Sequence, residues 1–217
     1  ELVHRVKEGG ALPMFTSCSP GWIRYVEYYY PELIPNLSSC KSPMQMFGAT
    51  VKTYWAKKEG IDPKNIYVVG VMPCTAKKFE KTRDHENASG YPDIDAVLTT
   101  RELAKMIKNA GIIYQDLPDG TYDNPLGEFT GAGVIFGATG GVMEAALRTA
   151  AETITGKSLD AIEYKEVRGT KGIKEASYDL NGVKVKVAVA SGLTNAKKLC
   201  EKIKKGECDY TFVEVMC

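Results

Sequence analysis

Hydrophobic and polar positions follow two periods along this chain, one typical of buried strands and one typical of amphipathic helices. Short apolar runs predict strands over residues 11–17, 65–72, 94–100 and 210–217. Apolar residues three and four apart predict helices over residues 20–33, 42–60, 75–84, 101–111 and 194–207. Because strands and helices follow one another, the pattern predicts an α/β fold with twisted, mostly parallel sheets flanked by helices.

The stretch between residues 126 and 192 departs from this simple alternation. It begins with a Gly-rich region whose second half, up to residue 156, reads as an Ala-rich helix. Apolar and polar residues then alternate over 161–169, 172–182 and 183–192, and Asn181-Gly182 is a strong hairpin turn. The chain is therefore expected to form a small antiparallel hairpin near residues 173–190. The helix after it is expected to be capped by Thr194 or Asn195.

The amino-acid composition limits the kinds of protein to which this chain can belong. With 217 residues, 44% of them hydrophobic, the chain can bury the core of one large domain or two lobes. A net charge of +1 gives no reason to expect nucleic acid or a membrane surface as partner. No stretch approaches the roughly 20 continuous apolar residues of a membrane span. The N-terminus, ELVHRVKEGG, lacks a signal-like apolar region, a helix cap and an initiator Met, so we take it as a cut end.

Six cysteines stand singly along the chain, at positions 18, 40, 74, 200, 208 and 217. No C-x-x-C pair is present, so a zinc knuckle or a thioredoxin motif is unsupported. Cys18, Cys74 and Cys217 each follow a predicted strand, and ligands collect at the carboxyl ends of the strands in open α/β sheets. A single such cysteine is most often a small buried hydrophobe. Three at equivalent strand ends favour a shared soft-metal site, such as an iron–sulfur centre.

Other residues near these cysteines have both a functional and an ordinary interpretation. Lys77 lies three residues after Cys74, where it could face an anion or could be a solvated helix lysine. Met72 and Met216 directly precede the strand ends, where they could line a site or fill the core. The Gly-rich segment at residues 130–141 lacks a clean G-x-G-x-x-G, although close glycines also let backbone approach a bulky ligand.

Three motifs together resemble the catalytic domain of the iron-only ([FeFe]) hydrogenases. That family carries T-S-C-C-P-x-W, M-P-C-x-x-K-x-x-E and E-x-M-x-C-x-x-C-x-x-G-G. The sequence reads TSCSPGW at 16–22, MPCTAKKFE at 72–80 and VEVMC at 213–217. LSSCKSPMQMFGA and FTGAGVIFGATGGVMEAALR are also typical of the family. The resemblance covers essentially the whole chain and is nearest to the catalytic subunits of cytoplasmic, NAD(P)-linked hydrogenases.

The resemblance implies a two-lobed catalytic domain that binds an H-cluster. This cofactor is a [4Fe–4S] cluster joined through one thiolate to a two-iron subsite with CO, cyanide and a bridging dithiolate. The implied reaction is reversible oxidation of H2 to protons and electrons. The implied partners are a ferredoxin or NAD(P)-linked subunits, in the cytoplasm, with no nucleic acid and no membrane span.

The resemblance also implies roles for individual residues. The expected metal ligands are Cys74, Cys217 and Cys18. The residues expected to act on the cofactor or in proton transfer are Cys18, Ser38, Glu1, Lys77, Met72 and Met216, with Arg5 beside the proton path. The further residues expected to contact the cofactor are Ser19, Pro73, Phe136 and Gly137. Serine and glutamate suit such a path because each can pass a proton along a hydrogen-bonded chain.

The sequence departs from the family pattern at three places. Ser19 stands where the first motif has its cluster-binding cysteine, and a serine oxygen is a poor replacement for a thiolate. Either Cys18 takes over ligation and Ser19 relays protons, or the site is altered. The last five residues have one residue fewer between Met216 and Cys217 than the third motif. The second cysteine and the Gly-Gly of that motif do not follow Cys217 within these residues. We therefore expect residues 1–217 to be a partial catalytic domain without the N-terminal ferredoxin-like domains.

Two other functions fit parts of the sequence. A non-catalytic iron–sulfur-binding relative, either an H2 sensor or an iron–sulfur assembly factor, would need neither Lys77 nor the two methionines that this chain retains. A small-molecule reductase would use the Gly-rich segment for a nucleotide.

Overall fold

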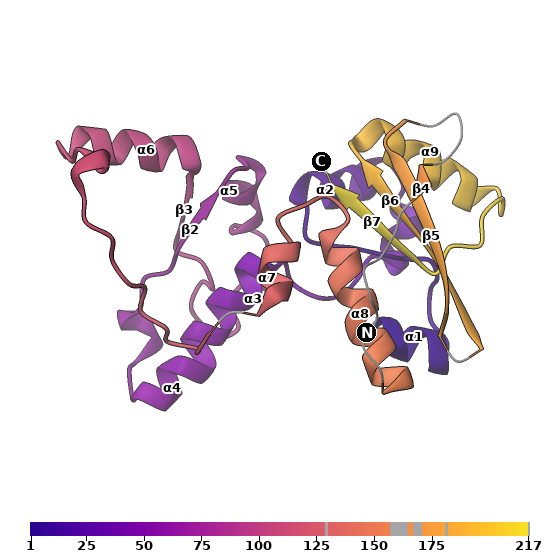
Figure 1. Ribbon diagram of the computed structural model, residues 1–217, viewed down its shortest axis with the longest axis horizontal. Helices are drawn as coiled ribbons and strands as arrows, with labels where there is room; N and C mark the ends of the chain where they lie inside the picture. The colour runs from indigo at the N-terminus through magenta and orange to yellow at the C-terminus, as the bar shows by residue number, and fades with distance from the viewer. Residues whose placement is uncertain (129, 157–164, 167–170, 181, 217) are drawn as a thin grey trace. The chain divides into compact units, whose positions relative to one another are not determined.

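The computed structural model describes residues 1–128, 130–156, 165–166, 171–180 and 182–216. The chain forms two compact units, each built around its own sheet (Figure 1). Unit 1 combines Glu1–Cys40 with Phe129–Cys217, and unit 2 is the intervening segment Lys41–Glu128. One unit is thus an insertion into the other.

Unit 1 contains a five-stranded sheet in the order β1-β7-β6-β5-β4. Its strands are β1 (Met14–Phe15), β7 (Phe212–Met216), β6 (Val183–Ser191), β5 (Ile173–Leu180) and β4 (Lys165–Glu166). The neighbours β1, β7 and β6 are parallel, whereas β5 is antiparallel to β6 and β4 is antiparallel to β5. The predicted antiparallel hairpin is thereby confirmed. Asn181 and most of the predicted strand at 161–169 lie outside the described residues.

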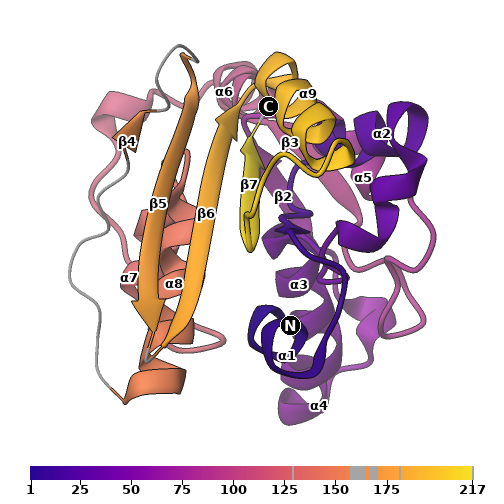
Figure 2. The ribbon, with the colours of Figure 1, turned by 90° about the vertical axis from the view of Figure 1, so that its right-hand side faces the viewer.

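The helices of unit 1 cover both faces of this sheet. They are α1 (Leu2–Glu8), α2 (Pro20–Tyr29), the 3₁₀ helix η1 (Pro31–Asn36), α7 (Gly131–Ile135), α8 (Gly141–Thr155) and α9 (Leu193–Lys204). Alternate residues of β6 face opposite ways: Val187 packs with Leu147 of α8, and Ala188 packs with Trp22 and Leu199 of α2 and α9. Figure 2 shows α8 running along the sheet. Both faces are therefore buried along β7 and over residues 187–190 of β6, whereas Lys174 and Ser177 of β5 are exposed.

Two helix boundaries in unit 1 differ from the sequence prediction. The helix predicted over residues 20–33 ends at Tyr29, because Pro31 supplies no backbone N–H and a 3₁₀ turn follows. The expected cap at Thr194 or Asn195 is wrong. Helix α9 begins at Leu193 after Gly192, whose φ of 80° only glycine adopts easily.

Unit 2 is built on two parallel strands, β2 (Val69–Met72) and β3 (Ala96–Thr99). Its helices are α3 (Pro43–Thr50), the π-helical turn η2 (Val51–Trp55), α4 (Ala56–Glu59), the 3₁₀ turns η3 (Pro63–Asn65) and η4 (Tyr114–Asp116), α5 (Ala76–Glu80) and α6 (Thr100–Asn109). Its core consists of Met44, Val51, Val68, Ile94 and Val97. The predicted helix over 42–60 is present as α3, η2 and α4 in succession.

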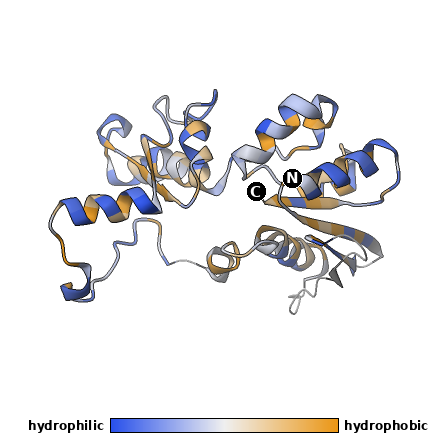
Figure 3. Cartoon of the chain, turned by 90° about the horizontal axis from the view of Figure 1, so that it is seen from above, coloured by the Kyte–Doolittle hydropathy of each residue, from blue (hydrophilic) through white to orange (hydrophobic). Residues whose placement is uncertain are grey.

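The helices carry hydrophilic and hydrophobic residues along their length, as their amphipathic patterns predict (Figure 3). Among the described residues, no helix has the length and apolar character needed to cross a bilayer.

Candidate functional site

In unit 1, the strand that leads to Cys18 and the strand that contains Met216 lie side by side. β1 and β7 are parallel, and their pairing continues beyond the last residue of β1. The Thr16 N–H donates to the Val213 carbonyl (3.0 Å), and the Val215 N–H donates to the Thr16 hydroxyl oxygen (3.2 Å). Cys18 and Met216 therefore lie at the carboxyl ends of two adjacent parallel strands.

The turn after β1 carries both Cys18 and Ser19. The fully buried Trp22 donates from Nε1 to the Thr16 carbonyl (3.1 Å), which ties the first turn of α2 to the strand end. Pro20 starts α2, and Ser19 precedes it as the N-cap residue. Ser19 is buried, whereas Cys18 is half-buried. Cys18 thus lies at the junction between strand and helix.

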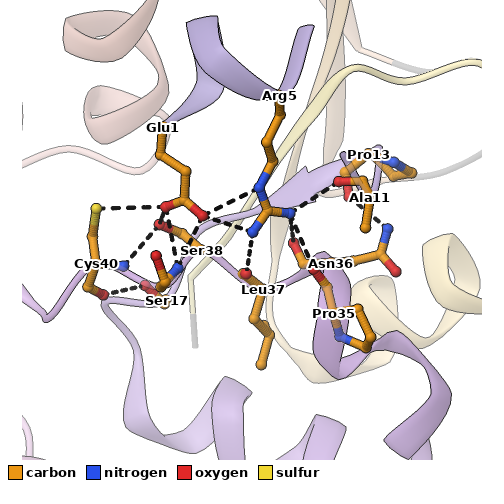
Figure 4. Close-up of polar contacts among 11 residues, drawn as sticks. Glu1, Arg5, Ala11, Pro13, Ser17, Pro35, Asn36, Leu37, Ser38 and Cys40 are labelled. Atoms are coloured by element: carbon orange, nitrogen blue, oxygen red, sulfur yellow. Dashed lines mark hydrogen bonds and ion pairs between the residues drawn. The ribbon is translucent and has the colours of Figure 1, made fainter. Parts of the chain in front are cut away.

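Glu1 and Ser38, separated by 37 positions, are in direct contact (Figure 4). The Ser38 hydroxyl donates to Glu1 Oε2 (2.5 Å), and the Ser39 N–H contacts both carboxylate oxygens (3.2 and 3.1 Å). Partial burial acts to raise the pKa of Glu1. Hydrogen bonds from Ser38, Ser39 and Arg5 outweigh it and lower that pKa from 4.5 to about 2. Glu1 is therefore a carboxylate at neutral pH.

Arg5 joins Glu1 to the segment before Ser38. Its Nε and Nη2 donate to Glu1 Oε1 (3.1 and 2.6 Å), and its Nη2 and Nη1 donate to the carbonyls of Leu37 (2.8 Å) and Ala11 (2.9 Å). The Arg5 side chain is only 13% exposed. Helix α1 has no buried residue, so the hydrogen bonds of the Arg5 guanidinium are a principal means of holding this helix to the rest of unit 1.

The segment that carries Cys18 is tied to the same cluster. The Ser17 hydroxyl donates to the Cys40 carbonyl (2.7 Å), and the Ser38 N–H donates to the Phe15 carbonyl (2.8 Å). Cys40, to which sequence analysis assigned no role in the site, is exposed, and its Sγ lies 3.5 Å from Glu1 Oε2. Unit 1 thus brings Glu1 and Ser38 together and fastens the Cys18 turn to their loop.

In unit 2, Pro73 and Cys74 follow β2 directly and lead into α5. Cys74 is half-buried and Pro73 is exposed. The Lys77 ammonium pairs with Glu80 Oε2 (2.6 Å), and the two side chains are 12% and 4% exposed. The anion beside the lysine in the structure is thus the carboxylate three residues further along the helix.

Glu80 also connects α5 to α3 through Ser42. The Ser42 hydroxyl donates to Glu80 Oε1, and the Ser42 hydroxyl oxygen accepts the Gln45 N–H (3.4 Å) at the start of α3. The side-chain amide of Gln45 is fully buried and makes no hydrogen bond within the part of the chain that the structure describes. Sequence analysis assigned no role in the site to Glu80, Ser42 or Gln45, although the spacing of three between Lys77 and Glu80 was a signal for the contact of these two side chains.

Phe136 and Gly137 lie in the turn between α7 and α8. Phe136 is half-buried and Gly137 is exposed. The turn ends at Gly140, whose N–H donates to Glu214 of β7 (2.8 Å). The Gly-rich segment is therefore attached to the strand that contains Met216.

The described cysteines are compatible with iron ligation but do not form a complete site. Cys18 belongs to unit 1 and Cys74 to unit 2, and Cys217 lies outside the described residues. Within the described ranges, no group of three His, Cys, Asp or Glu side chains converges as a metal site. Thiols that follow strand ends next to methionines fit a soft iron centre, whereas the hydroxyl of Ser19 fits it poorly.

Comparison with known proteins gives matches over the whole chain. Residues 1–217 match the family described as iron only hydrogenase large subunit, C-terminal domain. Iron hydrogenase 1 from Clostridium pasteurianum is 55% identical over 216 residues, which is 100% of this chain and 38% of that protein. The periplasmic [Fe] hydrogenase large subunit of Nitratidesulfovibrio vulgaris is 54% identical over 218 residues, 100% of this chain and 52% of that protein.

A third relative and a solved structure agree with these matches. The NADP-reducing hydrogenase subunit HndD of Solidesulfovibrio fructosivorans is 47% identical over 205 residues, 94% of this chain and 35% of that protein. A structure of the [FeFe]-hydrogenase HydA1 from Chlamydomonas reinhardtii superposes with a TM-score of 0.87 at 44% identity, over 100% of this chain and 62% of that chain. The predicted fold class is confirmed by this similarity. The chain spans about half or less of the length of these curated relatives.

Proposed function

Because the chain belongs to the family of the iron-only hydrogenase large subunit, C-terminal domain, we propose that the complete protein interconverts H2 with protons and electrons. The observation that carries the proposal is the match over residues 1–217, with identities of 54% and 55% to two hydrogenases. This chain would supply part of the catalytic domain, with no ferredoxin-like domain within residues 1–217.

The cofactor that fits this proposal is an H-cluster, a [4Fe–4S] cluster with a two-iron subsite. When bound, it supplies the metal chemistry that converts protons and electrons into H2. Cys74 would bind the cubane, with Cys217 as a further ligand. Cys18 would either join them or deliver protons, since Ser19 replaces the usual thiolate. The other residues proposed to contact the cofactor are Met72, Pro73, Lys77, Phe136, Gly137 and Met216.

Ser38 and Glu1 are proposed to carry protons between the surface and the site. The Ser38 hydroxyl donates to Glu1 and accepts the Cys40 N–H (3.2 Å). A hydroxyl oxygen has two lone pairs, so it can accept a proton at the second while its O–H proton passes to Glu1. With a pKa of about 2, Glu1 holds a proton only briefly at neutral pH. Arg5 keeps this carboxylate charged and in place.

Lys77 is proposed to donate a hydrogen bond to an anionic ligand of the cofactor. The ammonium already lies 2.6 Å from the Glu80 carboxylate, and an ammonium donates N–H groups to anions. Glu80 and Ser42 would then hold the lysine in the orientation that this role requires.

The electron partner is proposed to be a ferredoxin or an NAD(P)-linked subunit. Support for the second comes from the relative described as NADP-reducing, although its identity of 47% is below that of the two other hydrogenases. A cytoplasmic location stays a prediction, because the relative at 54% identity is described as periplasmic.

The test is anaerobic maturation of the complete protein, followed by infrared spectroscopy and H2 uptake with a redox dye. The proposal expects CO and cyanide bands together with dye reduction under H2. A cubane signal without those bands and without H2 uptake would instead favour a non-catalytic iron–sulfur protein. Specific binding of NAD(P)H to this chain alone would favour the nucleotide-dependent reductase.

Separate Cys18→Ala and Ser19→Ala variants of the complete protein distinguish the two possible roles of Cys18. Loss of the cubane signal identifies the ligand. Loss of turnover with the cubane intact identifies the proton relay.

A further inference from the structure

Glu214 is a fully buried carboxylate in the middle of the apolar sheet of unit 1. Its neighbours Val213 and Val215 face the core beneath α2 and α9, whereas Phe212 faces Met143 of α8. Because side chains alternate along a strand, Glu214 points to the same side as Phe212, toward α8. An acidic residue on this apolar face requires an explanation, since burying an unpaired charge is costly.

The Glu214 carboxylate binds the start of α8 with both of its oxygens. The Gly140 N–H donates to Oε1 (2.8 Å), and the Met143 N–H donates to Oε2 (2.7 Å). These groups belong to the cap residue and the third residue of a 15-residue helix, where backbone N–H groups lack partners inside the helix. A carboxylate at this position also interacts favourably with the helix dipole. β7 therefore supplies the cap of a helix that begins 73 positions earlier in the sequence.

The helix cannot supply this cap from its own sequence. Gly140 has a φ of 95° and no side chain, so it cannot accept the Met143 N–H. At Gly141, an added Cβ would lie 1.8 Å from the Ile135 carbonyl oxygen, so no side chain fits there either. The backbone angle disfavours a side chain at Gly140 and the Ile135 carbonyl excludes one at Gly141, so the acceptor comes from another element.

We propose that Glu214 is a positioning residue that fixes the turn from Phe136 to Gly140 to the end of β7. The two hydrogen bonds set the distance between this turn and the strand end that carries Met216. This inference rests on the proposed function, in which Phe136, Gly137 and Met216 contact the cofactor. Glu214 acts through this turn and does not itself contact a reacting atom. Burial raises the pKa of Glu214 above its usual value, although the two N–H donors act to lower it.

The test compares Glu214→Gln with a matched control, Glu201→Gln, in the complete matured protein. The first variant keeps the shape of the side chain but turns an NH2 group toward one of the two N–H donors. The control neutralises another acid of unit 1, whose carboxylate accepts the Tyr30 hydroxyl hydrogen (2.6 Å). Amide hydrogen exchange measures protection of residues 136–143, and electron paramagnetic resonance and infrared spectra report the cofactor.

For Glu214→Gln we expect exchange over residues 136–143 to be about tenfold faster or more, because a hydrogen bond to a charged group is lost. We also expect altered cubane resonances or shifted CO and cyanide bands. The Glu201→Gln control should match the wild type in both measurements. If Glu214→Gln does not fold, Glu214→Asp replaces it, and the same changes in exchange and spectra are expected. The shorter side chain keeps the charge, but its carboxylate is one methylene too short to reach both amides.

Three results would overturn the proposal. They are unchanged exchange at residues 136–143, equally faster exchange over the whole chain, and local loss of protection with unaltered spectra. The last would make Glu214 a structural cap only. A wild-type protein without CO and cyanide bands would refute the proposed function instead. Amide hydrogen exchange at residues 136–143 would then decide whether Glu214 fixes the turn.

Discussion

The contact between Glu1 and Ser38 makes a quantitative prediction about acid stability. Glu1→Gln removes the negative charge that Arg5 and the Ser38 hydroxyl stabilise. A pKa lowered from 4.5 to about 2 corresponds to at most ~3 kcal/mol of stability at neutral pH. Because the carboxylate is in contact with solvent, we expect a measured loss of ~1–2 kcal/mol.

The sign of the pH dependence follows from the direction of the shift. A carboxylate whose pKa is lowered by folding stabilises the protein above the pKa of the unfolded chain. That contribution is lost as the pH falls from 4.5 toward 2. The difference between wild type and Glu1→Gln should therefore shrink to roughly 40% of its neutral value by pH 3. Comparing two proteins at each pH cancels the titration of the other carboxylates.

Urea unfolding monitored by tryptophan fluorescence measures this difference. The chain has two tryptophans, and a Trp55→Phe background leaves only Trp22, which is fully buried in unit 1. Glu8→Gln, at the other end of α1, is the control, and its 68% exposed side chain should change the stability by less than about 0.5 kcal/mol. A stability difference for Glu1→Gln that is equal at pH 7 and pH 3 would refute the reasoning.

Three further predictions concern packing and thiols. Lys52, only 1% exposed, pairs with Asp95 (2.7 Å), so Lys52→Met should lower the stability of unit 2 by ~3 kcal/mol. Adding Asp95→Asn should restore part of that stability, measured by urea unfolding of a protein that retains Trp55 as the fluorescent reporter in unit 2. Gly48→Ala would place a Cβ 2.2 Å from a carbonyl oxygen and should cost roughly 1–3 kcal/mol; a gain in stability would contradict the packing. Iodoacetamide should modify the exposed Cys40 of the folded protein and spare Cys200, because burial raises the pKa of Cys200 to about 12. Mass spectrometry should find Cys200 modified only after unfolding, and equal rates for the two thiols would contradict the structure.

Much of the fold could be predicted from the sequence because its signals are local. Apolar runs identified the strands, and the Asn-Gly turn identified the antiparallel hairpin. The spacing of apolar residues over 42–60 predicted the helical stretch that contains α3, η2 and α4. The predicted start of α9 was wrong, since a helix cap depends on one backbone angle that the periodicity of side chains does not determine.

The sequence by itself determined that Cys18 and Cys74 follow strands, and that the chain resembles one enzyme family. Only the tertiary structure decided that Glu1 meets Ser38, that Lys77 is held through Glu80 to Ser42, and that Glu214 caps α8. The physical reason is the range of the interactions. Strands, turns and short motifs depend on residues close in sequence. The partner of a buried polar group depends on which distant segments the packed sheet brings within about 3 Å.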